Sequence, residues 1–278
     1  MDRSALEYWE ALAGKWRIVP PLAPSSDDVS YYEEIVGDFT NRRGGAPLDA
    51  LLLGVTPAIA TMRWPGKTSL IAVDWAANMF RHVWPRHGFP ERTVAVRGDW
   101  REIPLATASR DVVLGDGCYS AFESLEAAAP LNREVHRVLR PGGLYCLRCF
   151  CRPDQTLSLA KLFNELFSGR LRNLDLFRWL LAMAVHGDSR DGVRLRAVWR
   201  VWRERVPDPE PLRRRLGWSV DALANMERWG TLDSRYSFPT LLELRELAEP
   251  HFDLLSCDLP RYEWGERFPR LLMRARGA

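Results

Sequence analysis

The hydrophobic residues of this chain follow two different periods along the sequence. Between residues 46 and 151, unbroken apolar runs such as Leu51-Leu52-Leu53 and Leu70-Ile71-Ala72-Val73 are each followed by turn residues. Runs of this kind are typical of parallel strands that are buried on both faces of a sheet. Segments with helical spacing separate them, so the pattern predicts a doubly wound, mostly parallel α/β sheet.

Further strands are predicted in the same region at Thr93–Gly98, Asp111–Leu114 and Leu144–Cys151. A helix over Leu131–Leu139 precedes the last of them, and Pro141-Gly142-Gly143 is expected to end that helix. Near the carboxyl terminus, the runs Phe252–Cys257 and Phe268–Arg274 predict an antiparallel pair of strands at the edge of the sheet.

Helical spacing dominates the amino-terminal segment. An amphipathic helix is predicted from four apolar residues: Leu6, Trp9, Leu12 and Trp16. Prolines at positions 20, 21 and 24 end it. Ser25 then offers an N-cap with acidic residues in the first turn, and a second helix continues over Val29–Phe39.

The helical period returns after the fifth predicted strand. Apolar residues recur at helical spacing from Arg152 to about Trp229, and Thr240 with Glu243 has the form of a capping box that opens one more helix. The chain is therefore expected to have four parts: an amino-terminal helical segment (1–45), an α/β core (46–151), a helical insert (152–235) and the carboxyl-terminal part of the core (236–278).

Composition and charge narrow the choice of partners. The 278 residues carry a formal net charge of only +3, which gives no strong electrostatic case for nucleic acid or for a membrane surface. No apolar run reaches the roughly 18 residues of a membrane span, and the amino terminus lacks a basic-then-apolar signal pattern. We expect a cytoplasmic protein, and nothing in the sequence indicates its oligomeric state.

Five cysteines include a crowded group at Cys146, Cys149 and Cys151, which raises the question of a metal site. They fall on a predicted strand, where a period of two places Cys149 and Cys151 on one face and Cys146 on the other. One strand cannot aim all of them at one ion, so we expect buried structural cysteines and no metal.

The turn after the first strand is the leading candidate for a ligand site. Gly54 lets the chain turn closely, while Thr56 and Pro57 suit the N-cap and first position of a short helix. Asp74 ends the second strand, twenty residues after Gly54, which is roughly the spacing at which nucleotide-binding sheets place a carboxylate on ribose hydroxyls. The alternatives are an ordinary turn and an Asp74 that caps the helix beginning at Trp75.

Taken in order, these motifs resemble the class I S-adenosylmethionine-dependent methyltransferases. The residues that carry the resemblance are Leu51 to Gly54, Asp74, Gly98-Asp99, Val138 to Gly143 and the closing pair of strands. The glycine-rich turn of that family is reduced here to Gly54-Val55-Thr56-Pro57-Ala58, and the acid often found two residues before the first glycine is Leu52. Because Pro57 has no amide donor, the reduced turn suits a carboxylate better than a pyrophosphate.

The resemblance implies S-adenosylmethionine as cofactor and a role for each matching residue. Asp74 would hold the ribose, Asp99 would accept from the adenine amino group beside Trp100, and Met79 would pack on the adenine; plain core packing is the alternative for Met79 and Trp100, and a turn-forming role for Asp99. The full set of expected cofactor-binding residues is Gly54, Val55, Thr56, Pro57, Asp74, Trp75, Met79, Asp99, Trp100 and Gly115.

Methyl transfer from a sulfonium depends mainly on alignment, and a base is needed only when the acceptor carries a proton. Asp116, between two glycines after the fourth strand, is the first candidate for a catalytic residue, and Tyr119 is the second. The alternative is that Asp116 only satisfies turn amides. His186 and His251 lie in less familiar regions and are further candidates to reach an acceptor.

The helical insert is expected to cover the site and to select a small-molecule acceptor. Its many arginines leave a nucleic-acid (tRNA) methyltransferase open as an alternative, but acidic residues lie among them and offset much of the charge. Other classes also stay open: a non-catalytic module that binds the cofactor as a sensor or scaffold, and a nicotinamide-dependent oxidoreductase, which would normally require a fuller glycine-rich turn.

Overall fold

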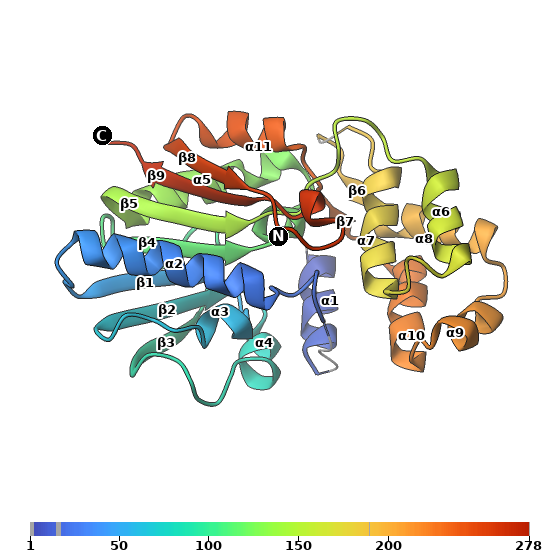
Figure 1. Ribbon diagram of the computed structural model, residues 1–278, viewed down its shortest axis with the longest axis horizontal. Coiled ribbons are helices and arrows are strands. Elements are labelled where there is room, and N and C mark those ends of the chain that lie inside the picture. Colours follow the sequence, from blue (N-terminus) through green and yellow to red (C-terminus); the bar gives the residue numbers. More distant parts are fainter. Residues whose placement is uncertain (1–2, 15–17, 189, 278) are drawn as a thin grey trace.

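The computed structural model describes residues 3–14, 18–188 and 190–277. Its centre is a seven-stranded sheet in the order β3-β2-β1-β4-β5-β9-β8, in which β9 runs antiparallel to both of its neighbours. Figure 1 shows these strands with helices on both faces. Their bounds are β1 Leu48–Leu53, β2 Thr68–Asp74, β3 Arg92–Arg97, β4 Arg110–Asp116, β5 Leu139–Arg148, β8 Phe252–Asp258 and β9 Arg270–Ala275. The predicted α/β sheet with an antiparallel edge pair is therefore confirmed.

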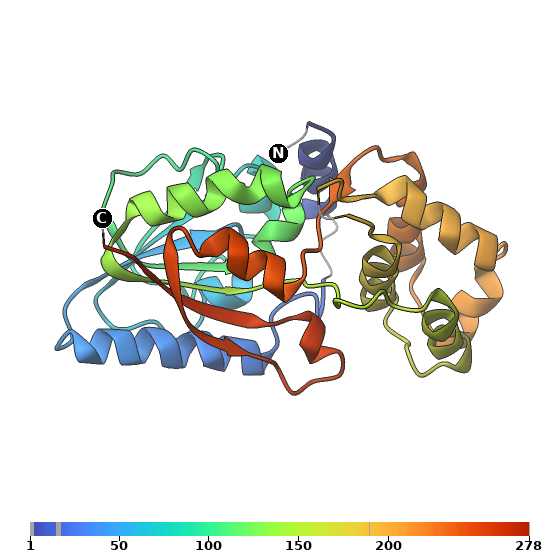
Figure 2. The same ribbon diagram turned by 90° about the horizontal axis from the view of Figure 1, so that it is seen from above.

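Helices cover the sheet on both faces, as the view from above in Figure 2 shows. The bounds of the helices of this part are α1 Arg3–Ala13, α2 Ser26–Arg42, α3 Pro57–Ala60, α4 Ala77–His82, α5 Leu125–Val138 and α11 Leu241–Ala248. Tyr32 and Val36 of α2 pack with Leu52 on one face. Val135 of α5 and Leu244 of α11 share a core with the other face. Strands buried on both faces explain the unbroken apolar runs.

The helix before β5 differs from its prediction at both ends. It begins earlier, at Leu125, because the Ser124 hydroxyl accepts a hydrogen bond from Ala127 N at 3.1 Å. Strand β5 then starts at Leu139, so Pro141 to Gly143 lie inside the strand. The pairing of β5 with β4 shifts there, from Arg110 with Leu139 to Val112 with Leu144. Gly142 has a φ of +75°, which is the backbone conformation that this irregularity requires.

The segment between β5 and α11 is helical, as predicted, and lies beyond the carboxyl ends of the strands (Figure 1). Its bounds are α6 Leu159–Ser168, α7 Leu174–Val185, α8 Leu195–Arg205, α9 Glu210–Leu216 and α10 Val220–Arg228, with the short strands β6 Val193–Arg194 and β7 Arg235–Tyr236. Single 3₁₀ turns occur at Cys118–Ala121, Trp229–Thr231 and Gly265–Arg267. Phe177 and Trp202 of the insert pack against each other in an apolar core that also includes Phe150 and Phe268 from the rest of the chain.

The crowded cysteines lie on opposite faces of the sheet. Cys146 belongs to the core beneath α2, whereas Cys149 and Cys151 belong to the core beneath α5 and α11. All of them are buried, as expected for structural cysteines. In the part of the chain that the structure describes, no group of metal-binding side chains gathers, and no helix is both long and apolar enough to span a membrane.

Some expected features of the amino terminus are only partly visible. Helix α1 occupies the predicted segment, but Trp16 and the side chain of Leu12 lie outside what the structure describes. Helix α2 begins at Ser26, with Ser25 as its N-cap and Asp28 completing a capping box. The acidic first turn therefore has the role that its sequence predicts.

We predict that the capping box of α11 stabilises the fold measurably. Thr240 Oγ1 accepts from Glu243 N at 3.2 Å, and Glu243 Oε2 accepts from Thr240 N at 2.7 Å. Thr240→Ala should lower the free energy of unfolding by about 1 kcal/mol, measured by urea denaturation. Thr240→Ser keeps the hydroxyl and serves as the control. Equal unfolding midpoints for the two variants would contradict the prediction.

Candidate active site

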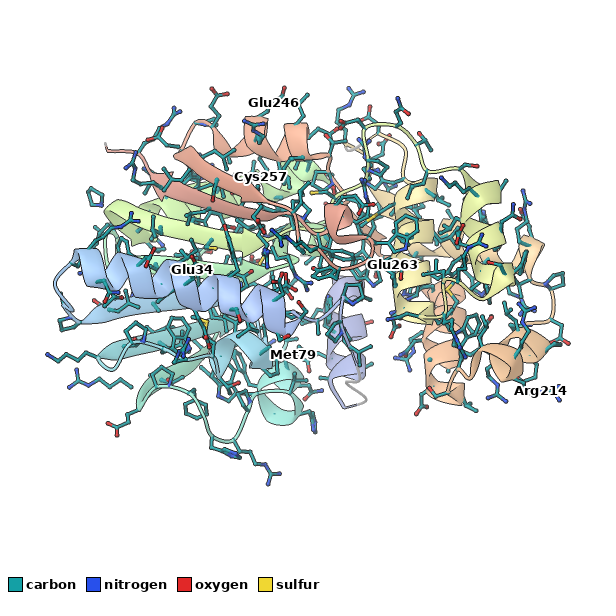
Figure 3. All side chains as sticks on the ribbon, viewed as in Figure 1. Glu34, Met79, Arg214, Glu246, Cys257 and Glu263 are labelled. Carbon is teal, nitrogen blue, oxygen red and sulfur yellow. The ribbon has the colours of Figure 1, made fainter. Side chains whose placement is uncertain are left out.

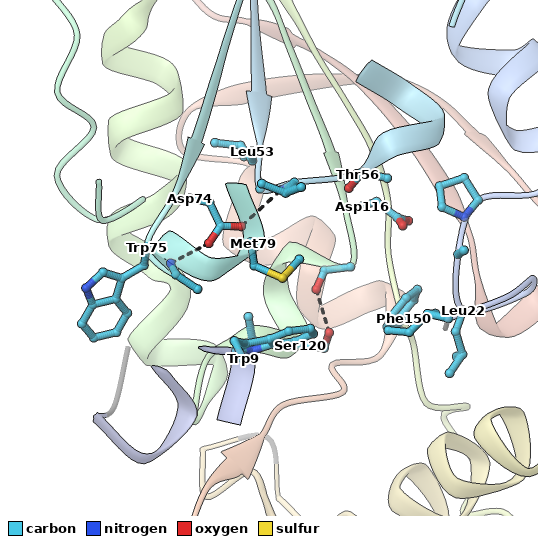
Figure 4. Close-up of a pocket in the computed structure, with 18 of the residues that line it drawn as sticks. Trp9, Leu22, Leu53, Thr56, Asp74, Trp75, Met79, Asp116, Ser120 and Phe150 are labelled. Atoms are coloured by element: carbon cyan, nitrogen blue, oxygen red, sulfur yellow. Dashed lines mark hydrogen bonds between the residues drawn. The ribbon is translucent and has the colours of Figure 1, made fainter. Parts of the chain in front are cut away.

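A cavity of about 320 Å³ opens at the carboxyl ends of β1, β2 and β4. Figure 4 shows its walls, which come from the strand ends, the amino-terminal segment and the insert. The lining residues are Leu6, Trp9, Ile18, Leu22, Ala23, Pro24, Leu53, Gly54, Val55, Thr56, Pro57, Ala58, Asp74, Trp75, Ala76, Met79, Trp100, Asp116, Gly117, Ser120, Ala121, Phe150, Trp179 and Tyr236. The carboxyl edge of a parallel sheet is the usual location of a ligand site.

The turn after β1 is shaped around Gly54. This residue has a φ of +89°, and a Cβ placed on it would lie 3.2 Å from Trp100 Cζ2 and 3.6 Å from an Asp74 carboxylate oxygen. A side chain here would be strained and crowded, so glycine is required. Thr56 and Pro57 take the predicted N-cap and first positions of α3, but the Thr56 side chain makes no capping hydrogen bond.

The Asp74 carboxylate joins the ends of β1 and β2. Its Oδ2 accepts from Val55 N at 3.1 Å and its Oδ1 accepts from Ala76 N at 2.8 Å (Figure 4). Burial raises the pKa of Asp74 to about 6, while these two backbone donors act in the opposite direction. The Asp74 side chain therefore lies in the cavity wall, where two backbone amides compensate only part of its negative charge.

Helix α4 is capped by a residue that the sequence analysis did not identify. Glu10 of α1 accepts from Ala77 N at 2.7 Å and from Asn78 N at 2.9 Å. Asp74 is therefore not the cap of this helix, although it binds the preceding amide. The contact holds α1 beside the cavity, where Trp9 lines the wall. No local pattern in the sequence predicts a contact between residues so far apart in the chain.

The adenine-side predictions have mixed outcomes. Trp75, Met79 and Trp100 all line the cavity, and Trp100 Nε1 donates to Val73 O at 2.7 Å. Asp99 does not line it. Its carboxylate is instead bound by the guanidinium of Arg101 at 2.6 to 3.1 Å. Burial alone would raise the pKa of Asp99, but the hydrogen bonds from Arg101 hold that pKa below its usual value. We therefore do not carry Asp99 forward as a ligand of the adenine.

Gly115 supports the site from behind. It does not line the cavity, and its carbonyl oxygen accepts from the Tyr32 hydroxyl at 2.7 Å. A Cβ on Gly115 would come within 2.7 Å of Cys118 Sγ, so the strand end is tightly packed at this point. Gly115 therefore shapes the end of β4, and the residues that follow it, Asp116 and Gly117, line the cavity.

Asp116 lines the cavity, as predicted, but it is one half of a buried ion pair. Arg148 Nε donates to Asp116 Oδ1 at 2.6 Å, and Arg148 Nη2 donates to Asp116 Oδ2 at 3.1 Å. Burial raises the pKa of Asp116, and the charge of Arg148 opposes that shift. The expectation that Asp116 merely satisfies turn amides is replaced by this pairing.

Arg148 also holds the amino-terminal segment in place. It is fully buried, and its Nη1 and Nη2 donate to Pro21 O at 2.6 Å and to Leu22 O at 2.9 Å. A second carboxylate, from Asp28, lies 3.4 Å from Nη1. One guanidinium therefore fixes both Asp116 and the Leu22 wall of the cavity. Arginine is suited to this task because it presents five donors in a rigid plane.

The other catalytic candidates lie outside the cavity wall. The Tyr119 hydroxyl donates to Asn132 Oδ1 at 2.5 Å within the core beneath α5, so its predicted catalytic role is abandoned. His251 packs against His136 at the start of β8, at the opposite end of the sheet. His186 follows α7 and does not line the cavity.

Several lining residues were not predicted. An aromatic wall is formed by Phe150 after β5, Trp179 of the insert and Tyr236 just after the insert, and Ser120 also lines the cavity (Figure 4). The sequence showed these aromatics only as members of a helical or strand pattern. Their convergence depends on how the insert docks on the sheet.

Comparisons with known proteins agree with this architecture. Residues 51–147 match the family model described as a methyltransferase domain. A malonyl-acyl-carrier protein O-methyltransferase from Xylella fastidiosa (strain M23) is 34% identical over 103 residues. That stretch covers 37% of this chain and spans only 33% of the length of the relative.

Solved structures show the same fold. A structure from Rhodobacter sphaeroides, described as a candidate zinc-dependent alcohol dehydrogenase, covers all of both chains with a TM-score of 0.64 and 14% identity. The N-methyltransferase NodS from Bradyrhizobium japonicum, in complex with S-adenosyl-L-homocysteine, covers 99% of this chain and 100% of its own with a TM-score of 0.51 and 10% identity. At such identities the likeness concerns the fold alone.

These findings confirm the predicted class. The core of the chain is a methyltransferase domain of the class I, S-adenosylmethionine-dependent type. The dehydrogenase description of one structural neighbour carries no reaction over to this chain, because only the fold is shared.

Removal of the buried cation should destabilise the protein strongly. Arg148→Met leaves the Asp116 and Asp28 carboxylates buried without their partner, so we expect the free energy of unfolding to fall by about 3–5 kcal/mol. Arg170→Met, which removes an exposed ion pair with Glu165, is the control and should leave the urea midpoint nearly unchanged. Similar midpoints for the two variants would show that the network is dispensable.

Proposed function

We propose that this protein transfers a methyl group from S-adenosylmethionine to a small-molecule acceptor held in the cavity. The observation that carries the proposal is the Asp74 carboxylate, which is buried beside the Gly54 turn inside a methyltransferase domain. A carboxylate in that position suits a pair of ribose hydroxyls. The complex of NodS with S-adenosyl-L-homocysteine shows that this fold accommodates such a ligand.

The residues present fit this cofactor. Each Asp74 oxygen has two acceptor sites and uses one of them for a backbone amide, so acceptor capacity is left for two hydroxyl donors. The turn from Gly54 to Pro57 would hold the methionine end. Met79 and Trp75, which also line the cavity, would flank the adenine.

When bound, S-adenosylmethionine supplies an electrophilic methyl group on a sulfonium. The protein contributes alignment and the exclusion of water, which alone provide much of the acceleration in such reactions. Three apolar side chains of the cavity wall would exclude water: Trp9 of α1, Leu22, and Trp179 of the insert. Asp116 faces the same space and is the residue that we propose to accept a proton from an acceptor that carries one.

The insert, residues 152–235, is proposed to be the acceptor cap. Trp179 lines the cavity from α7, and Tyr236 follows directly after the insert. Several arginines of the insert are engaged with neighbouring acids, as Arg190 is with Asp188 and Arg213 with Glu210. Arg214 lies at the outer end of the insert in Figure 3, away from the cavity. These pairings favour a small acceptor over a nucleic acid.

Loss of the Asp74 carboxylate should weaken cofactor binding. A charge-assisted hydrogen bond contributes about 1.5–3 kcal/mol, so Asp74→Ala should reduce the affinity for S-adenosylmethionine by roughly ten- to a hundredfold in calorimetry. Asp253→Ala is the matched control, because Asp253 is a partly exposed acid of β8 that is paired with Arg276 outside the cavity wall, and its removal should leave the affinity unchanged. Unchanged affinity in a folded Asp74→Ala protein would remove Asp74 from the site.

Cofactor affinity should also fall in acid. Ribose hydroxyls donate to the ionised carboxylate, and Asp74 takes up a proton as the pH drops through about 6. Because the pKa is raised, protonation is favoured in the folded, ligand-free protein and competes with binding. Below pH 6 we expect S-adenosyl-L-homocysteine affinity to fall by up to about tenfold per pH unit. The Asp74→Asn protein should bind more weakly without that dependence, and a parallel slope in both proteins would contradict the prediction.

A further inference from the structure

The acceptor side of the cavity is bounded by aromatic rings that brace one another. Phe150 packs edge-on against Trp179 with ring centroids 5.0 Å apart, and Trp179 stacks on Tyr236 at 5.3 Å with an interplanar angle of 17°. Phe238 supports Trp179 from behind at 5.1 Å. The rings meet at steep as well as shallow angles, so together they form a rigid aromatic wall, which favours an aromatic ligand mainly through edge contacts.

The charges around the cavity have only one sign. Among the described lining residues the ionisable acids are Asp74 and Asp116, and none is lysine, arginine or histidine. The nearest cation to Asp116 is Arg148, but its guanidinium is fully buried and already bonded to Asp116, Pro21 and Leu22. A ligand that enters the cavity therefore meets no described cationic side chain with which to pair.

An anionic acceptor is disfavoured by this arrangement. The carboxylate of the cofactor is assigned to the Gly54 turn, so a second carboxylate, on the acceptor, would have to lie elsewhere in the cavity. There it would lose its water and would find no described cationic side chain in the wall, because Arg148 behind the wall is already paired with Asp116. A neutral polar group avoids these costs, because Asp116 can accept a hydrogen bond from it and Ser120, whose hydroxyl donates to Gly117 O at 2.6 Å, keeps acceptor capacity.

We infer that the acceptor is an uncharged aromatic molecule that binds against this wall and carries no free carboxylate. The inference rests on the proposed function and names the acceptor class of that same site. It separates this chain from its curated relative, whose named acceptor, a malonyl group, carries a carboxylate. The site would discriminate against an acceptor that carries a carboxylate because that carboxylate finds no cation to pair with. The preference between acceptors therefore depends on their charge more than on their shape.

The experiment compares two probes of equal shape. Indole-3-acetamide is neutral and indole-3-acetate is its anionic counterpart; both are titrated by calorimetry into the full chain saturated with S-adenosyl-L-homocysteine at pH 7.5. We expect the amide to bind at least about tenfold more tightly than the acetate. Equal or tighter binding of the acetate overturns the inference, and so does the absence of saturable amide binding.

Variants test which residues are responsible. Trp179→Phe should weaken amide binding several-fold, whereas Trp199→Phe, a tryptophan of the insert outside the cavity wall, should leave it unchanged. Asp116→Asn frees the charge of Arg148 and should shrink or reverse the preference for the amide. If a folded Asp116→Asn protein still prefers the amide to the acetate by the same factor, the charge argument is overturned. If that variant does not fold, the ratio of the two affinities in the unmodified protein decides the matter.

The binding of S-adenosyl-L-homocysteine is measured first, so the two proposals can fail separately. If it does not bind, the proposed function falls. If it binds and the acetate is preferred, the proposed function stands and the inference about the acceptor falls.

Discussion

The structure depends on one buried cation. Arg148 is fully enclosed, and it joins the end of β4 through Asp116, the start of α2 through Asp28 and the segment at Leu22. A guanidinium without water must have all of its donors satisfied, so none of these partners can move independently. The wall of the cavity that faces the proposed acceptor is held by the same set of bonds.

The two acids of the cavity illustrate how environment sets chemistry. Asp116 is matched by a full positive charge, whereas Asp74 is bound by backbone amides and its pKa is raised by burial to about 6. The charge of Asp74 is therefore only partly compensated by the protein, and hydroxyl donors from a ligand would complete it. The ends of β2 and β4, on either side of β1, thus offer one acid whose charge is left partly uncompensated and one that is held in place by an ion pair.

The cavity is closed by parts of the chain that lie outside the matched methyltransferase domain. That domain covers residues 51–147, but Trp9 comes from α1 and Trp179 comes from α7. The proposed cofactor side therefore lies mostly within the matched domain, whereas the proposed acceptor side also includes residues from helices outside it. This division explains why the domain match says more about the cofactor than about the acceptor, and why the acceptor class has to be argued from the charges and rings of this particular wall.

Local sequence patterns determined the strands, the turn at Gly54 and the place of Asp74, because a strand buried on both faces must be apolar throughout and its end is marked by turn residues. They did not indicate that the side chain of Asp99 is bound by Arg101 or that the hydroxyl of Tyr119 is bonded within the core. Contacts between distant parts of the chain, above all that of Arg148 with Asp116, follow from no local period. Only tertiary packing brings such groups together, since the burial that makes the pairing necessary is itself a product of the fold.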